Sequence, residues 1–134
     1  MTGLVLKLSP RERILVNGAV LENGDRRSKL SILTPNANIL RLKDAVQPKD
    51  AKTPVRRVCY IAQLVLSGDV DEDKAKNQLS SGLTQLGQVF IDTDSKESLS
   101  TASAALEAND FYRVLKNVRS LLPQEDRLIA AAAQ

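Results

Sequence analysis

Apolar and polar positions alternate over the first forty residues, a pattern typical of short antiparallel strands. Leucines at positions 4, 6 and 8 fall on one face of the first such strand, with Val5 and Lys7 on the other. Apolar residues on both sides of Asn17-Gly18 predict a two-residue β-hairpin, because Asn and Gly tolerate the positive φ of its turn. About five strands within residues 1–42 predict a small antiparallel β-sheet or barrel, since a lone hairpin is marginal in water.

The apolar period changes to that of helices after residue 53. Thr53-Pro54 is typical of a helix start, with Thr as N-cap and Pro at the first helical position. Apolar residues at helical spacing then predict four amphipathic helices in residues 54–123, with Pro123 ending the fourth. Residues 43–53 are expected to form a connector, and residues 124–134 a frayed or loosely helical tail. The predicted fold class is α+β.

The segment from Asn23 to Leu30 combines a turn signal with a group of cations. Asn23, Gly24 and Asp25 are expected to form the turn, because Gly and Asn accept positive φ. Arg26, Arg27 and Lys29 follow directly, so the reversal should display positive charge. A second arginine pair, Arg56-Arg57, opens the first predicted helix.

Charge is distributed unevenly along the chain, which carries a net charge of +3. Residues 1–57 contain twelve Lys and Arg against five Asp and Glu, whereas residues 58–134 contain seven against eleven. A basic half beside an acidic half indicates a region that faces a polyanion. Two alternatives are ordinary surface solubility and mutual attraction between the halves.

The basic half supplies the candidate binding residues. Guanidinium groups match phosphate geometry and stack on bases, so a cluster of them favours contact with RNA or DNA. The first 59 residues contain no Phe, Tyr or Trp, which argues against stacking of bases on aromatic rings. A structural alternative is that Asp25 and Asp50 pair with the arginines. The candidates are Arg11, Arg13, Arg26, Arg27, Lys29, Arg41, Arg56 and Arg57.

Catalytic, metal and cofactor sites find little support in the sequence. A single cysteine, Cys59, and the lack of histidine argue against zinc sites of Cys and His, thiol–histidine catalysis and serine–histidine triads. The acidic run that starts at Asp69 resembles a calcium loop, but Lys74 stands where Gly is needed and Ser80 where Glu is needed. We therefore expect no enzyme, no metal and no cofactor.

Location and assembly are also expectations at this point. No apolar run reaches the roughly 18 residues of a membrane span, and the start lacks the features of a signal peptide. We expect a cytoplasmic protein without membrane association. Short exposed edge strands would allow a homodimer.

Five motifs resemble the FlbT family, the flagellum biosynthesis repressor proteins of alphaproteobacteria. Their order along the chain and the two Arg-Arg signatures make the resemblance fairly specific, and it covers nearly the whole length. The motifs are Leu4-Val5-Leu6-Lys7-Leu8, Asn17-Gly18-Ala19-Val20, Asn23 to Ser28 (Asn-Gly-Asp-Arg-Arg-Ser), Thr53-Pro54-Val55-Arg56-Arg57 and Asp110-Phe111-Tyr112-Arg113-Val114-Leu115-Lys116.

The resemblance implies a post-transcriptional regulator that associates with the 5′ untranslated leader of flagellin messenger RNA and lowers its translation and lifetime. Because some members act positively on flagellin, the resemblance does not fix the sign of regulation. It also implies a small partner protein, FlaF. The rival hypothesis is an adaptor or chaperone-like factor that binds flagellin or FlaF through its helices and affects the message indirectly.

Overall fold

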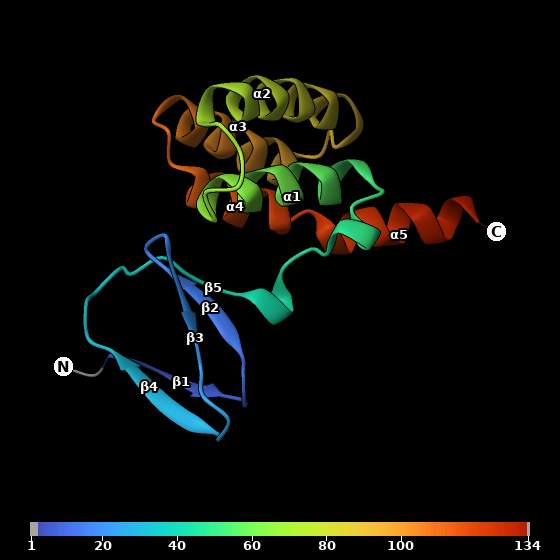
Figure 1. Cartoon of the computed structure of the whole chain (residues 1–134). Helices are drawn as coiled ribbons and strands as arrows, with labels where there is room; N and C mark the ends of the chain where they lie inside the picture. The colour runs from blue at the N-terminus through green and yellow to red at the C-terminus, as the bar shows by residue number, and fades with distance from the viewer. Residues whose placement is uncertain (1–2, 134) are drawn as a thin grey trace. The chain divides into compact units, whose positions relative to one another are not determined.

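The computed structural model describes residues 3–133 and confirms the α+β fold class. Its contacts divide the chain into two compact units, residues 1–45 (unit 1) and residues 46–134 (unit 2). Within the described range, unit 1 contains five strands and unit 2 contains five α-helices (Figure 1). The predicted connector is partly ordered as two 3-10 helices, η1 (Leu42–Asp44) in unit 1 and η2 (Pro48–Asp50) in unit 2.

Unit 1 consists of two small antiparallel sheets. In one sheet β1 pairs with β4, and in the other β2 lies between β3 and β5. The predicted small antiparallel arrangement is therefore present, divided between two sheets. The strands are β1 (Leu4–Leu8), β2 (Arg13–Val16), β3 (Ala19–Glu22), β4 (Ser28–Ile32) and β5 (Ile39–Arg41).

The hairpin predicted at Asn17-Gly18 is confirmed. These residues have φ values of 49° and 87° and join β2 to β3, with Val16 opposite Ala19. The prediction for Asn23 and Gly24 was wrong in its mechanism, because neither residue has a positive φ. The chain does not return along β3 after them; it crosses to the other sheet, where β4 pairs with β1.

Unit 1 has a thin apolar core. Leu6 and Leu8 of β1 and Ile14 of β2 are the buried members of one cluster, to which both sheets contribute. Leu15 and Leu40, which are register partners in β2 and β5, are buried as well. Four partly buried side chains pack against the Leu6, Leu8 and Ile14 cluster: Val16, Leu30, Ile32 and Ile39. All four residues of β3 are exposed.

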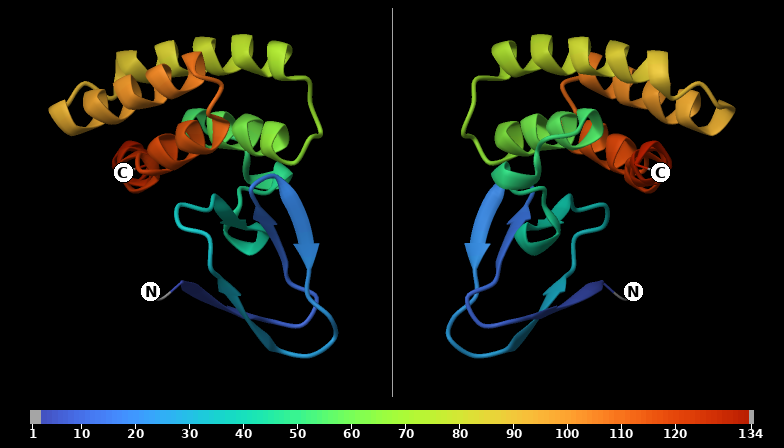
Figure 2. Two further views of the ribbon diagram at one scale, coloured as in Figure 1. Left: turned by 90° about the vertical axis from the view of Figure 1, so that its left-hand side faces the viewer. Right: turned by 90° about the vertical axis from the view of Figure 1, so that its right-hand side faces the viewer.

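Unit 2 is built around four helices that each pack against two others. Within this unit α1 contacts α2 and α4, and α3 contacts the same two helices, which places α2 and α3 in one layer and α1 and α4 in the other (Figure 2). The buried faces are aliphatic and recur at helical spacing. These helices are α1 (Pro54–Leu66), α2 (Glu72–Val89), α3 (Thr93–Glu107) and α4 (Phe111–Arg119).

Two local features set the position of α1. The predicted start is confirmed, because Thr53 caps the helix and its side chain accepts a hydrogen bond from the Arg56 N–H at 3.4 Å. Gly82 of α2 lies against Val58, so close that a Cβ at position 82 would stand 2.7 Å from a Val58 methyl carbon. A glycine is thus needed here for the close approach of the two helices.

A fifth helix, α5 (Leu122–Ala132), replaces most of the tail expected over residues 124–134. Pro123 does not end α4, which stops at Arg119; it lies in the first turn of α5, where its missing N–H has no partner to lose. The helix contacts α1 near its own N-terminal end. None of the helices in residues 3–133 is long and apolar enough to cross a membrane.

Candidate nucleic-acid interface

Two loops of unit 1 are joined by main-chain hydrogen bonds. Residues 9–12 connect β1 to β2, and residues 23–27 connect β3 to β4. The Arg11 N–H donates to the Gly24 carbonyl and the Asn23 N–H donates to the Glu12 carbonyl, each at 2.8 Å. Arg11 has a φ of 61°, which is uncommon for a residue with a side chain and persists only where the surroundings impose it. We call these two segments the paired loops.

The side chain of Asn23 connects both loops. Its Nδ2 donates to the carbonyl of Ser9 at 2.8 Å and to the carbonyl of Arg26 at 2.9 Å, and its Oδ1 accepts from the Ser28 hydroxyl at 2.7 Å. Asn23 therefore shapes the segment through its carboxamide, whereas the sequence suggested its backbone. In the Asn23–Ser28 motif, the first and last residues form the hydrogen bonds that fix the loop, and the two arginines lie between them.

Glu12 fixes the first of the paired loops through its carboxylate. That group accepts from the Arg41 guanidinium at 2.7 and 2.8 Å and from the Ser9 N–H at 2.9 Å. The hydrogen bonds from Arg41, followed by the one from Ser9, lower the pKa of Glu12 to about 2. Arg41 also donates to the Lys7 carbonyl at 2.7 Å, so the same guanidinium holds the end of β1.

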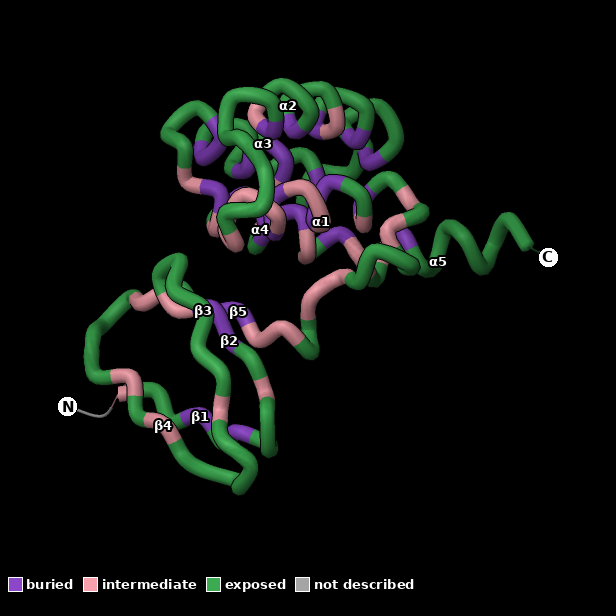
Figure 3. Tube along the Cα trace, viewed as in Figure 1, coloured by how far each residue is buried: buried purple, intermediate pink, exposed green. Residues whose placement is uncertain are grey.

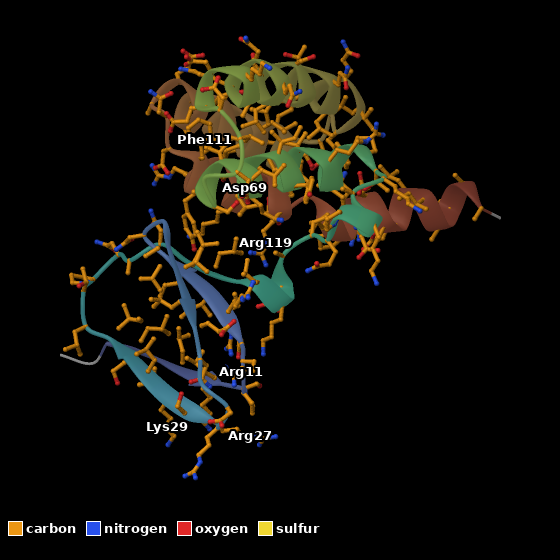
Figure 4. All side chains as sticks on the ribbon, in the orientation of Figure 1. Arg11, Arg27, Lys29, Asp69, Phe111 and Arg119 are labelled. Carbon is orange, nitrogen blue, oxygen red and sulfur yellow. The ribbon has the colours of Figure 1, made fainter. Side chains whose placement is uncertain are left out.

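Arg26, Arg27 and Lys29 project from the paired loops and the start of β4 without ionic partners. All three are exposed, and none of their side chains forms an ion pair or a hydrogen bond with another residue in 3–133. Arg11 forms one long ion pair, in which a Glu22 carboxylate oxygen lies 3.8 Å from its guanidinium. The labelled side chains of Arg11, Arg27 and Lys29 lie at the same end of unit 1 (Figure 4).

The other predicted arginines have partners already. Arg13 pairs with Glu22 across the β2–β3 ladder at 2.9 Å, and Arg41 pairs with Glu12. In unit 2, Arg56 contacts two acids of α5 at 3.0 and 2.9 Å, while Arg57 makes only a 3.4 Å bond to a carbonyl. The acids that pair with these arginines are Glu12, Glu22, Glu125 and Asp126, and they do not include the predicted Asp25 and Asp50.

Metal and thiol chemistry find no site in the described part of the chain. No group of three or more Cys, Asp or Glu side chains is arranged to hold a metal ion there. Cys59 is buried in α1, and burial raises the pKa of its thiol to about 12, so the thiolate that would react is scarce at neutral pH.

Comparison with known proteins decides the family. The family model described as flagellar protein FlbT matches residues 4–129. The chain belongs to the FlbT family. A probable flagellum biosynthesis repressor protein FlbT from Caulobacter sp. (strain K31) is 32% identical over 92% of this chain and 94% of its own length. A flagellum biosynthesis repressor protein FlbT from Caulobacter vibrioides is 31% identical over 92% of this chain and 86% of its own length. No solved structure was found to match.

In this FlbT chain, three residues of the candidate interface were missed by sequence reasoning. Lys7 reaches it because β1 pairs with β4, and Ser9 and Glu12 because the loop after β1 meets the loop after β3. The alternation of β1 places Lys7 on the outward face, which was a usable signal. No signal in the sequence indicated that the two loops would meet, because their contact depends on a pairing between distant strands.

Proposed function

We propose that this FlbT protein regulates flagellin synthesis after transcription by binding the 5′ untranslated leader of flagellin messenger RNA, repressing its translation and promoting its decay. The observation that carries the proposal is the set of unpaired, exposed cations Arg26, Arg27 and Lys29 on and beside the hydrogen-bonded paired loops. The names of the relatives, flagellum biosynthesis repressor proteins, support a regulatory role.

Loops held in one conformation bind with a smaller entropic cost than loops that must be ordered first. Arg26 and Arg27 have no ionic partners within residues 3–133, while hydrogen bonds hold the backbone that carries them. Each guanidinium group can contact two phosphate oxygens at once. Because the first 59 residues contain no aromatic side chain, phosphate contact and guanidinium stacking should be the main attractions. We therefore expect single-stranded RNA to bind with a marked dependence on salt.

The test is a titration of the full chain with flagellin leader RNA and with a scrambled RNA of equal length, at several salt concentrations. Each phosphate contact with a single strand contributes about −0.7 to the slope of log affinity against log salt. Arg26→Ala with Arg27→Ala should weaken binding to the leader and flatten this slope by about 1.4.

The matched control is Arg113→Ala with Lys116→Ala, which removes two exposed cations from α4 in unit 2. This variant should retain both the affinity and the slope. Equal binding of wild-type protein to leader and scrambled RNA, or an unchanged slope in the folded Arg26/Arg27 variant, would contradict the proposal.

A second candidate, an adaptor that binds FlaF or flagellin, is favoured by one feature of unit 2. An apolar pocket of about 290 Å³ lies between the C-terminal end of α2 and α5. Its lining includes Val89, Leu128 and Ile129, which are 59%, 47% and 47% exposed. Leu128→Lys should abolish capture of purified FlaF or flagellin if this candidate is right, and should leave binding to leader RNA unchanged.

A further inference from the structure

Two lysines face each other in the ladder between β1 and β4. Lys7 is the register partner of Lys29, and both are exposed. Directly opposed residues in an antiparallel pair have their Cβ atoms about 5 Å apart, and like charges at this spacing destabilise the pair. Neither ammonium group has a carboxylate partner within residues 3–133. The sheet thus keeps an electrostatic cost that an anion would remove.

A pocket opens beside this lysine pair. Its volume is about 630 Å³, and its lining adds a third cation, Arg27, but no carboxylate. The lining residues are Lys7, Leu8, Ser9, Arg27, Ser28 and Lys29. A pocket with three cations and no acid is suited to a ligand that concentrates several negative charges in a small volume.

The backbone around the pocket is held in place by side chains outside its lining. Arg41 donates to the Lys7 carbonyl, and Asn23 binds the Ser9 carbonyl and the Ser28 hydroxyl. The strand register fixes the position of β1 relative to β4 at the pocket, because Leu8 lies opposite Ser28. The backbone that carries the three cations is therefore held in place before any ligand binds.

We propose that the pocket formed by Lys7, Arg27 and Lys29 binds the terminal phosphate group at the 5′ end of an RNA chain. An internal phosphodiester carries one negative charge, whereas a terminal phosphate carries nearly two at neutral pH and a triphosphate carries more. Three cations, two of which repel each other, match the terminal group better. This inference rests on the proposed function, because it assigns one part of the same RNA to one part of the same surface.

The experiment compares three forms of one twelve-nucleotide leader RNA that differ only at the 5′ end: triphosphate, monophosphate and hydroxyl. The full-length protein should bind the triphosphate form about tenfold more tightly than the hydroxyl form, with the monophosphate between them. Equal affinity for all three forms would overturn this inference and leave the proposed function standing. Failure of all three to bind would overturn the proposed function and the inference with it.

Variants test whether the preference for a 5′ phosphate depends on the pocket. Lys7→Gln with Lys29→Gln should bring the three affinities within about twofold of each other, and the relief of like-charge repulsion should keep the fold stable. The control Lys49→Gln removes an exposed cation of η2 and should retain the preference. A preference that survives in the folded lysine variant would overturn the assignment. Binding of free GTP as tight as that of the triphosphate RNA would overturn it too, because the pocket would then take free nucleotides instead.

Discussion

Unit 1 and unit 2 maintain their conformations by different means. Unit 2 buries aliphatic side chains on every one of its four packed helices, whereas unit 1 leaves most of its residues exposed around a small core (Figure 3). In unit 1 the loops are held instead by hydrogen bonds from Asn23 and by the ion pair between Glu12 and Arg41. Apolar packing dominates one unit and polar bonding shapes the loops of the other.

This difference explains how an exposed surface can be both charged and ordered. A loop that relied on apolar burial would have to turn its side chains inward, which would bury the cations that we propose to bind RNA. Polar bonds to the backbone leave Arg26 and Arg27 free because they use the carbonyl of Arg26 and the side chain of Asn23 instead. Removing a polar group in unit 2 should therefore affect stability alone, whereas removing one from the paired loops should also affect RNA affinity.

The largest expected effect comes from the buried carboxylate that joins α5 to α1. Glu125 accepts from the Thr53 hydroxyl, from the Val55 N–H at 2.8 Å and from Arg56 at 3.0 Å. Glu125→Ala would leave a buried N–H at the positive end of α1 without its acceptor. We expect a loss of about 2–4 kcal/mol in the free energy of unfolding, measured by denaturant titration followed by circular dichroism.

The control for this prediction is Asp126→Ala, which removes the exposed partner of the same arginine. An exposed ion pair contributes about 0–1 kcal/mol, so this variant should remain close to wild type. Leader RNA should bind both variants as it binds wild type, since neither substitution lies in unit 1. Equal destabilisation by the two substitutions would contradict the role given to the buried carboxylate.

A smaller effect is expected from Asn23→Ala, which removes three hydrogen bonds without changing charge. The bonds are exposed, so the free energy of unfolding should fall by about 1–2 kcal/mol, and amide exchange should accelerate in the paired loops but not in α1–α4. Affinity for leader RNA should fall while the salt slope stays constant, because the cations that we propose to contact phosphates remain. Asn77→Ala, at an exposed position of α2, should change none of these quantities.

The same contrast determines how much could be read from the sequence. Helical spacing and the Thr53-Pro54 start predicted α1, and Asn17-Gly18 predicted its hairpin, because these signals are local. The Arg26-Arg27 motif located exposed cations for the same reason. Which cations remain unpaired was not predictable, since the partners of Arg41 and Arg56 are 29 and 69 residues away. The pairing of β1 with β4, which brings Lys7 beside Lys29, is equally remote in sequence.

The smallest effect should appear on acidification, through the carboxylate of Glu12. Its pKa is about 2 in the folded chain and near 4.5 when unperturbed, so the folded state favours the ionised form. The stabilisation is complete above pH 4.5 and is lost as the pH falls from there towards 2. Glu12→Gln should be less stable than wild type at neutral pH, and the difference should shrink over this interval. Amide exchange of the paired loops between about pH 6 and pH 3 measures it, and a difference that stays constant across that range would show that Glu12 does not hold the loop through its charge.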